Sequence, residues 1–95
     1  MKWYRRDGSI ADDMAVFAKR FSDPAYKIVK QETLPDGRFL STVWLGLDHS
    51  FNQNEKPIIF ETMLFGQNGN EEDAARYSTE AEAILGHEAM KARNT

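Results

Sequence analysis

The chain has 95 residues, of which 41% are hydrophobic and 28% are charged, and it contains no cysteine. This composition predicts a single globular domain over residues 1–95, and it excludes a disordered chain, a disulfide framework, a thiolate metal site and a cysteine nucleophile. The formal net charge is −3, with +1 over residues 1–48 and −4 over 49–95, so neither half has the clustered positive charge of a nucleic-acid-binding domain.

No apolar run approaches the ~20 residues that span a bilayer, and no secretory signal pattern opens the chain. Together with the lack of cysteine, this favours a cytoplasmic protein that does not bind membranes. Aromatic residues make up 12% of the chain. Such rings have to be buried in a core, an interface or a ligand site, so their placement is the main question that the composition raises.

The N-terminal part is expected to form an extended arm, a turn and a helix. The Asp7-Gly8 pair indicates a turn after the arm. Apolar side chains then recur every three or four positions, at Ile10, Met14, Phe17 and Phe21. This spacing predicts an amphipathic helix over 10–21. We expect Ser9 to be its N-cap and Pro24 to mark its end.

Three strands are expected next. Residues 25–33 and 39–47 are rich in β-branched and aromatic residues, and Pro35-Asp36-Gly37 between them is a strong turn signal, so these segments predict a hairpin. Residues 57–65 form an apolar third strand. The polar, acidic segment 66–76 is predicted to be a loop.

The C-terminal part is expected to be a helix over 80–93, because Thr79 and Glu82 have the spacing of a capping box. Tyr77 precedes this cap and is expected to pack against the helix start. The predicted fold is α+β, with an N-terminal helix, a three- to four-stranded antiparallel sheet and a C-terminal helix in the order α-β-β-β-α.

Alternation along the second and third strands predicts apolar side chains on both faces of the sheet. We expect Phe39 and Phe60 to meet Phe17 and Phe21 on the face that the helices cover. The other face is expected to carry Trp44, Met63 and Phe65, interrupted by Asp48 and Glu61. Gly46 on that face would admit a backbone or a ring at close range. Two alternatives remain open for it: a homodimer interface (or one helix on each face), or a platform for a ligand or partner.

The residues that could carry chemistry are few. Asp48-His49-Ser50 offers an acid, a base and a hydroxyl, but adjacent strand residues point to opposite faces and cannot form a relay. His49, His87, Asp48 and Glu61 are metal ligands in kind, but no pair has helical i,i+4 spacing and His87 lacks the second histidine of a zincin motif. No phosphate-binding glycine motif occurs. We therefore predict no catalytic residue, no metal and no cofactor.

Several strings in the chain resemble a family of small phage-encoded accessory proteins. They are STVWLGLDH over 41–49, IFETM over 59–63 and RYST over 76–79, and the similarity extends over about residues 4–92. The resemblance implies a phage or prophage origin and expression in the cytoplasm of an infected bacterium. It implies no reaction, so no catalytic residue is carried over.

The sequence thus predicts a non-enzymatic phage accessory protein that binds and modulates a host protein, with a defence system as one candidate target. A homodimer or higher oligomer is expected. The predicted binding residues are Trp44, Asp48, His49, Glu61, Met63, Arg76 and His87. The alternative is a module that sequesters a small molecule or nucleotide, in which Trp44 stacks on a base and His49, His87 and Arg76 bind phosphates.

Overall fold

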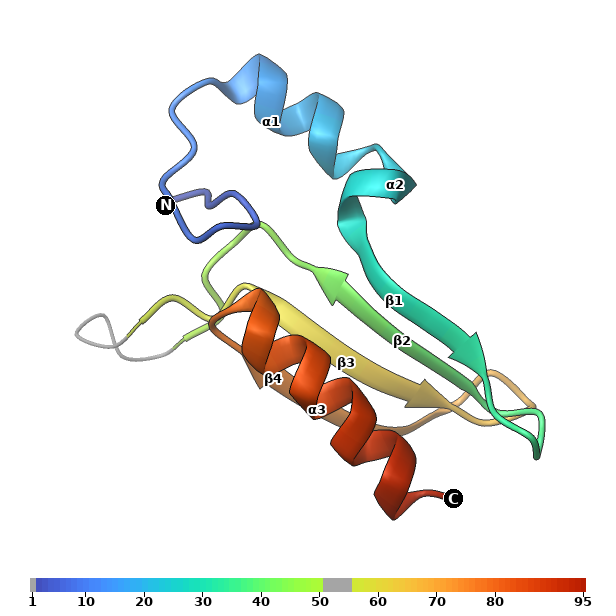
Figure 1. The fold of residues 1–95 in the computed structure, drawn as a ribbon. Coiled ribbons are helices and arrows are strands. Elements are labelled where there is room, and N and C mark those ends of the chain that lie inside the picture. Colours follow the sequence, from blue (N-terminus) through green and yellow to red (C-terminus); the bar gives the residue numbers. More distant parts are fainter. Residues whose placement is uncertain (1, 51–55) are drawn as a thin grey trace.

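The computed structural model describes residues 2–50 and 56–95. Its elements are α1 (Met14–Phe21), α2 (Pro24–Lys27), β1 (Ile28–Thr33), β2 (Phe39–Trp44), β3 (Phe60–Phe65), β4 (Glu71–Tyr77) and α3 (Glu80–Arg93), as Figure 1 shows. The strands form one antiparallel sheet in the order β1-β2-β3-β4. The predicted α+β class, with helices at both ends of the chain, is confirmed.

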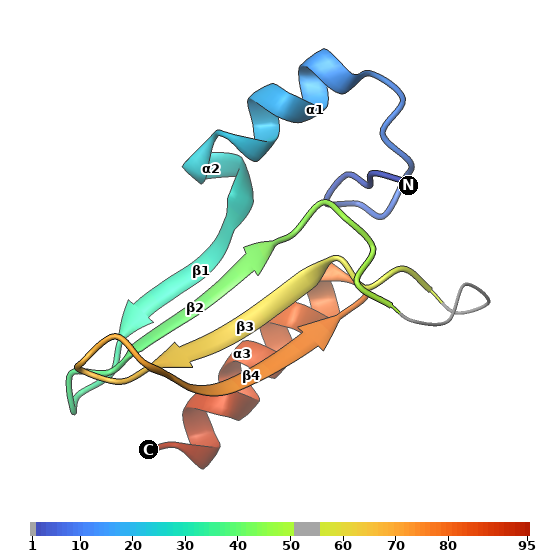
Figure 2. The same ribbon diagram turned by 180° about the vertical axis from the view of Figure 1, so that it is seen from behind.

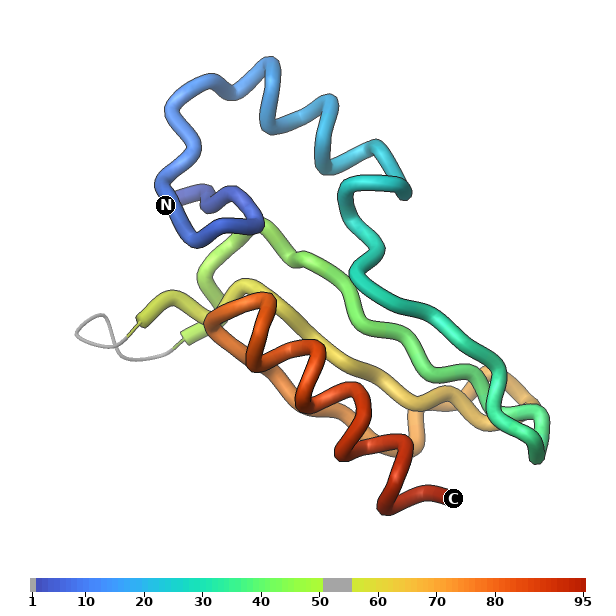
Figure 3. Tube along the Cα trace, in the orientation of Figure 1, coloured from blue at the N-terminus to red at the C-terminus, as the bar shows by residue number. Residues whose placement is uncertain are grey.

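The helices are placed unequally around the sheet. Helix α3 lies across one face, and α1 and α2 lie beyond one end of β1 and β2 (Figure 1). Seen from behind, no helix covers the opposite face in the described part of the chain (Figure 2). The tube in Figure 3 shows the N-terminal arm between α1 and the sheet. None of the described helices is both long enough and apolar enough to cross a membrane.

Helix α1 begins at Met14, so the predicted start at Ile10 and the predicted Ser9 cap are wrong. The N-cap is Asp13, whose Oδ1 accepts hydrogen bonds from the backbone N–H groups of Ala15 and Val16. A carboxylate that accepts two amide protons is a strong cap. Ile10 instead forms an antiparallel bridge with the arm, which keeps residues 10–13 extended.

The segment predicted as a loop over 66–76 contains most of a strand, so this prediction is wrong. Gly66 to Asn70 form a turn, with the N–H of Gly66 donating to the carbonyl of Asn70 at 2.8 Å. Strand β4 follows and pairs with β3. Its acidic side chains suit an edge strand, where they discourage pairing with another chain. The predicted turn at Pro35-Asp36-Gly37 and the capping box at Thr79 are both confirmed.

The predicted grouping of side chains on the two sheet faces is also wrong. Register pairs Trp44 with Phe60, and Phe39 with Phe65. Trp44 therefore lies on the face that α3 covers and is only 1% exposed. Its ring lies 5.3 Å from that of Phe17. Alternation defines two faces for each strand, but it does not say which face of one strand continues onto the next.

Two apolar clusters make up the core. One cluster gathers at the α1 end and contains Phe17, Trp44, Ile59, Phe60 and Ala83, and the other gathers at the hairpin end and contains Leu34, Leu40, Leu64 and Met90.

Two glycines allow rings to approach this core closely. Gly46 has φ +78°, and a Cβ there would lie 2.8 Å from the ring of Phe17. The ring that approaches Gly46 thus belongs to the chain's own core, whereas the sequence placed this approach on the uncovered face. The ring of Tyr77 lies against Gly86 of α3, beyond the helix start where it was expected.

Candidate functional site

A chain of buried polar side chains crosses the centre of the core. The Nδ1 atom of His87 lies 2.7 Å from the hydroxyl of Thr42, which lies 2.6 Å from the hydroxyl of Thr62. The Nε2 atom of His87 lies 2.7 Å from Oε2 of Glu32. Thr42, Thr62 and His87 are all 0% exposed. The chain therefore joins α3 to three neighbouring strands between the two apolar clusters.

The direction of these hydrogen bonds follows from the charge of Glu32. Hydrogen bonds from Lys91 and then His87 lower the pKa of Glu32 to about 2, so its carboxylate is ionised near neutral pH and only accepts. Nε2 of His87 therefore carries a proton and donates it to Glu32. With Nδ1 as an acceptor, Thr62 donates to Thr42 and Thr42 donates to His87. This arrangement satisfies each buried polar atom.

A hydroxyl, an imidazole and a carboxylate in this order are the components of a nucleophilic triad. Helix α3 seals the two hydroxyls and the imidazole from solvent, while the Glu32 side chain stays 22% exposed, and a substrate cannot reach a hydroxyl that is 0% exposed. The geometry therefore gives His87 a structural role: it holds α3 on the sheet. The sequence analysis placed His87 among the binding residues, but its side chain is 0% exposed and lies within the core.

Glu32, His87 and Glu88 offer three metal-ligand atoms within 4.8 Å of one another. The ammonium groups of two lysines already form ion pairs with these carboxylates. Lys91 lies 2.7 Å from Glu32, and Lys30 bonds Glu88 while lying 3.6 Å from Glu32. Both lysines would have to leave before a metal ion could bind, so the cluster is better described as an ion-pair network at the edge of α3.

Asp48 and His49 hold a loop together at the end of the sheet. Oδ1 of Asp48 accepts hydrogen bonds from the N–H groups of Ser50 (2.8 Å) and Ile58 (2.9 Å). The N–H of His49 donates to the carbonyl of Ile58 at 2.8 Å. These bonds tie residues 48–50 to Ile58, and residues 51–55 of the intervening segment lie outside the described part of the chain.

Glu61, Met63 and Arg76 are the predicted binding residues that come together. Glu61 pairs with Arg76 across β3 and β4, with Oε2 and Nε 2.9 Å apart. Their face, opposite α3, is here called the open face. It consists of Phe39, Ser41 and Val43 from β2, Glu61, Met63 and Phe65 from β3, and Ala74 and Arg76 from β4. Sequence reasoning missed Phe39 and Val43, because it assigned them to the covered face.

Four of the seven large hydrophobic side chains that are exposed in the described residues lie on α1 or shortly before it. Ile10, Met14, Val16 and Phe21 are between 38% and 52% exposed, and we call these four residues the α1 surface. Three of them, Ile10, Met14 and Phe21, belong to the predicted apolar stripe, which was expected to face the sheet, and Val16 does not. Only Phe17 of α1 is buried.

A small cavity lies between the N-terminal arm, α1, α2 and the end of β2. Its volume is about 130 Å³, and its walls include Ala11, Val16, Phe17, Arg20 and Trp44. Small-molecule sites usually measure about 300–1,000 Å³, so this cavity is too small for a nucleotide. His49, His87 and Arg76 lie elsewhere, and the four residues of the small-molecule alternative do not meet at one site.

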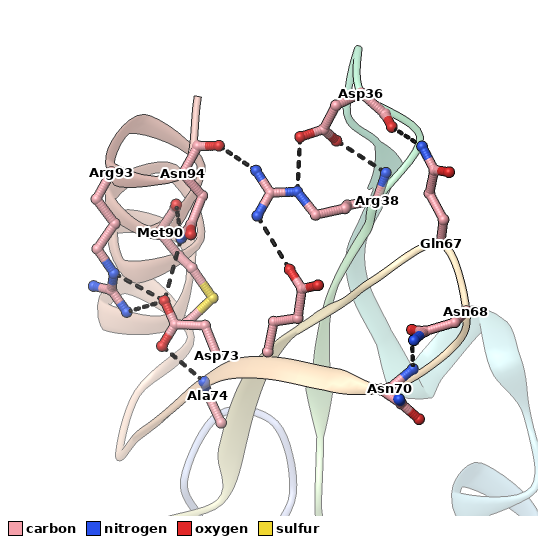
Figure 4. A network of polar contacts seen from close by, with 11 residues as sticks. Asp36, Arg38, Gln67, Asn68, Asn70, Asp73, Ala74, Met90, Arg93 and Asn94 are labelled. Atoms are coloured by element: carbon pink, nitrogen blue, oxygen red, sulfur yellow. Dashed lines mark hydrogen bonds and ion pairs between the residues drawn. The ribbon is translucent and has the colours of Figure 1, made fainter.

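A second polar network fastens the hairpin end of the sheet to the end of α3 (Figure 4). Nε of Arg38 lies 2.7 Å from Asp36, Nη1 lies 3.2 Å from Glu72, and Nη2 bonds the carbonyl of Asn94. Asn94 also donates to Asp73 at 3.2 Å. These charges are met within the chain, so the network is structural.

Comparison of the chain with family models, curated proteins and solved structures gave no match.

Proposed function

We propose that this chain is a phage-encoded, non-enzymatic accessory protein that binds a host protein through the α1 surface. One observation carries the proposal. Of the seven large hydrophobic side chains that are exposed in the described residues, four belong to the α1 surface. Gathered apolar side chains on the surface of a small soluble domain mark an interaction site.

The α1 surface is also held firmly. Phe17 projects from the inner side of α1, and its ring lies 4.4 Å from that of Trp3 and 5.3 Å from that of Trp44. An eight-residue helix is marginal on its own, so this aromatic contact fixes it. A preordered surface loses less conformational entropy on binding than a mobile one.

The phage origin rests on the resemblance of the strings described above. If this origin is right, the partner is a protein in the cytoplasm of an infected bacterium, and a component of a defence system is one candidate. The non-enzymatic assignment is supported by the burial of the Thr42 hydroxyl and the His87 imidazole, which leaves these two groups without access to a substrate.

The open face supports self-association as a second part of the proposal. Its Glu61 and Arg76 neutralise each other, so this pair does not select a charged partner. Both sheet edges carry a register shift, in β1 and beside β4, which discourages strand addition. Three strands of six residues and one of seven cover roughly 19 by 20 Å. Two such faces would bury roughly 800 Å², the size of a weak, transient interface.

The partner is tested by capture from lysate of infected cells. The tagged wild-type chain is compared with an Ile10→Glu/Met14→Glu variant and with Leu85→Glu as the control, because Leu85 is 72% exposed on α3, away from the α1 surface. We expect a host protein that the wild type and Leu85→Glu retain and that the double variant loses. The proposal fails if the double variant, with an unchanged melting curve, retains every protein that the wild type retains.

A further inference from the structure

The cavity beside α1 has the size of a site for a single side chain. Its volume of about 130 Å³ is close to that of an engineered cavity of about 150 Å³ that binds benzene. It therefore has room for a single ring or a branched aliphatic side chain. Phe17, Trp44 and Tyr26 supply apolar walls, and Val16 belongs both to the cavity and to the exposed α1 surface, so the cavity opens onto that surface.

One charged group at this cavity has no carboxylate within ion-pair distance in the described residues, although the charge of Asp7 acts on it from farther away. The guanidinium of Arg20 lies over the ring of Tyr26, 5.1 Å from its centroid, and forms no ion pair in the part of the chain that the structure describes. Arg5, which also lines the cavity, is already engaged by Asp12 at 2.7 Å and by the carbonyl of Ile10. A guanidinium beside an aromatic wall favours a carboxylate that arrives with an apolar group.

The acidic side chain that lines the cavity does not cancel this preference. Oδ1 of Asp13 accepts the N–H groups of Ala15 and Val16, at 3.0 and 3.2 Å, so its charge is directed to the first turn of α1. Asp7 is held in the same way by Ser9. Arg20 is thus the cation at this cavity that remains available to a ligand.

We propose that this cavity binds one aromatic or branched aliphatic side chain of the partner, next to a carboxylate that pairs with Arg20. The ligand class is an apolar residue beside an acidic residue or at a peptide C-terminus. The inference rests on the proposed function, since the side chain belongs to the bound partner. A buried apolar anchor in a pocket, with a charge beside it, is the usual arrangement at the centre of an interface.

The site can be tested without the partner, with 3-phenylpropionate as the probe and its neutral amide as the matched control. Binding is followed by two-dimensional NMR of the full chain, using the indole N–H of Trp44, which donates to the carbonyl of Tyr4 at 3.0 Å. We expect saturable shifts at millimolar concentration, at least threefold tighter for the carboxylate. Arg20→Gln should remove this preference, and Ala11→Leu, which fills the cavity, should abolish binding of both probes.

The proposal is overturned if neither probe gives saturable shifts, if the two probes bind equally, or if Ala11→Leu leaves binding unchanged. Should Ala11→Leu fail to fold, Val16→Phe fills the same cavity from α1. Partner capture separates this inference from the proposed function. If Ile10→Glu/Met14→Glu loses the partner while Ala11→Leu keeps it, the α1 surface stands as the binding surface and the side-chain pocket does not.

Discussion

The Nε2 atom of His87 lies 2.7 Å from Oε2 of Glu32, and this contact joins the middle of α3 to the outer strand β1. The same ring reaches Thr42 on β2 through Nδ1. Ala83 and Met90, the other buried residues of α3, belong to the apolar clusters on either side. A polar contact between two apolar clusters fixes the position of a helix along a sheet, because a shift by one turn would leave buried polar atoms unpaired.

Replacing His87 alone should destabilise the fold strongly. His87→Leu removes the donor to Glu32 and the acceptor of the Thr42 hydroxyl, so we expect the free energy of unfolding to fall by about 2–4 kcal/mol. The triple variant Thr42→Val/Thr62→Val/His87→Leu removes the buried hydroxyls as well and should lose less. Urea unfolding followed by circular dichroism measures both. A triple variant less stable than His87→Leu would contradict the role of the polar chain.

The contribution of Glu32 should depend on pH. Hydrogen bonds from Lys91 and His87 hold its pKa at about 2, below the ordinary value of 4.5. A carboxyl with a lowered pKa in the fold stabilises it above the unfolded pKa, and this contribution is lost as the pH falls through the folded pKa. Because Glu32 is partly exposed, solvent screening reduces the contribution to about 1–2 kcal/mol.

Comparison with Glu32→Gln isolates this effect from the other carboxylates. We expect the wild type to be more stable than Glu32→Gln at pH 7, and the difference to shrink between about pH 4.5 and about pH 2. Urea midpoints across this range provide the measurement. A difference that stays constant from pH 7 to pH 2 would mean that Glu32 is not stabilised as a carboxylate.

Gly86 offers a test in which two effects oppose each other. Helix propensity alone favours alanine by about 1 kcal/mol. A Cβ at this residue would lie 2.1 Å from the ring and the hydroxyl of Tyr77, and such overpacking costs about 1–3 kcal/mol. We expect Gly86→Ala to lower the melting temperature, and to raise it when introduced together with Tyr77→Ala relative to Tyr77→Ala alone. A Gly86→Ala variant more stable than the wild type would contradict this packing.

Self-association should depend on the open face. Met63→Glu places a charge beside Glu61 on the β3 surface that a second copy would cover. We expect the wild type to show concentration-dependent dimers by analytical ultracentrifugation at micromolar to millimolar concentration, and Met63→Glu to remain monomeric. Leu85→Glu on α3 is the control and should dimerise like the wild type. A wild type that is monomeric at every concentration, or a Met63→Glu dimer, rules this interface out.

The elements with local sequence signals were predictable. The Thr79–Glu82 capping box gives the bounds of α3, and Pro35-Asp36-Gly37 gives the first hairpin. Strand β4 was missed, because the acidic side chains of an exposed edge strand have the composition of a loop. The start of α1 was missed because the Ile10 bridge to the arm depends on a tertiary contact.

The site was harder to predict than the fold. Trp44 belongs to the core because β2 and β3 pair in the register that puts Trp44 on the same face as Phe60. Alternation along each strand does not distinguish this register from one that is shifted by a single residue. His87 had a usable signal: it follows Ala83 by four positions and precedes Met90 by three, so it belongs to the inner face of α3. The exposure of Ile10, Met14 and Phe21 had no such signal, because exposed and buried apolar stripes share the same spacing.

Site-specific photo-cross-linking in infected cells tests the central claim, that the α1 surface binds a host protein, most directly. A benzophenone amino acid is introduced at Met14 in one variant and at Leu85 in another, both exposed positions in the wild type. We expect a cross-linked host protein from position 14 and none from position 85. Cross-links that arise from position 85 and not from position 14, or no cross-link from position 14, would contradict it.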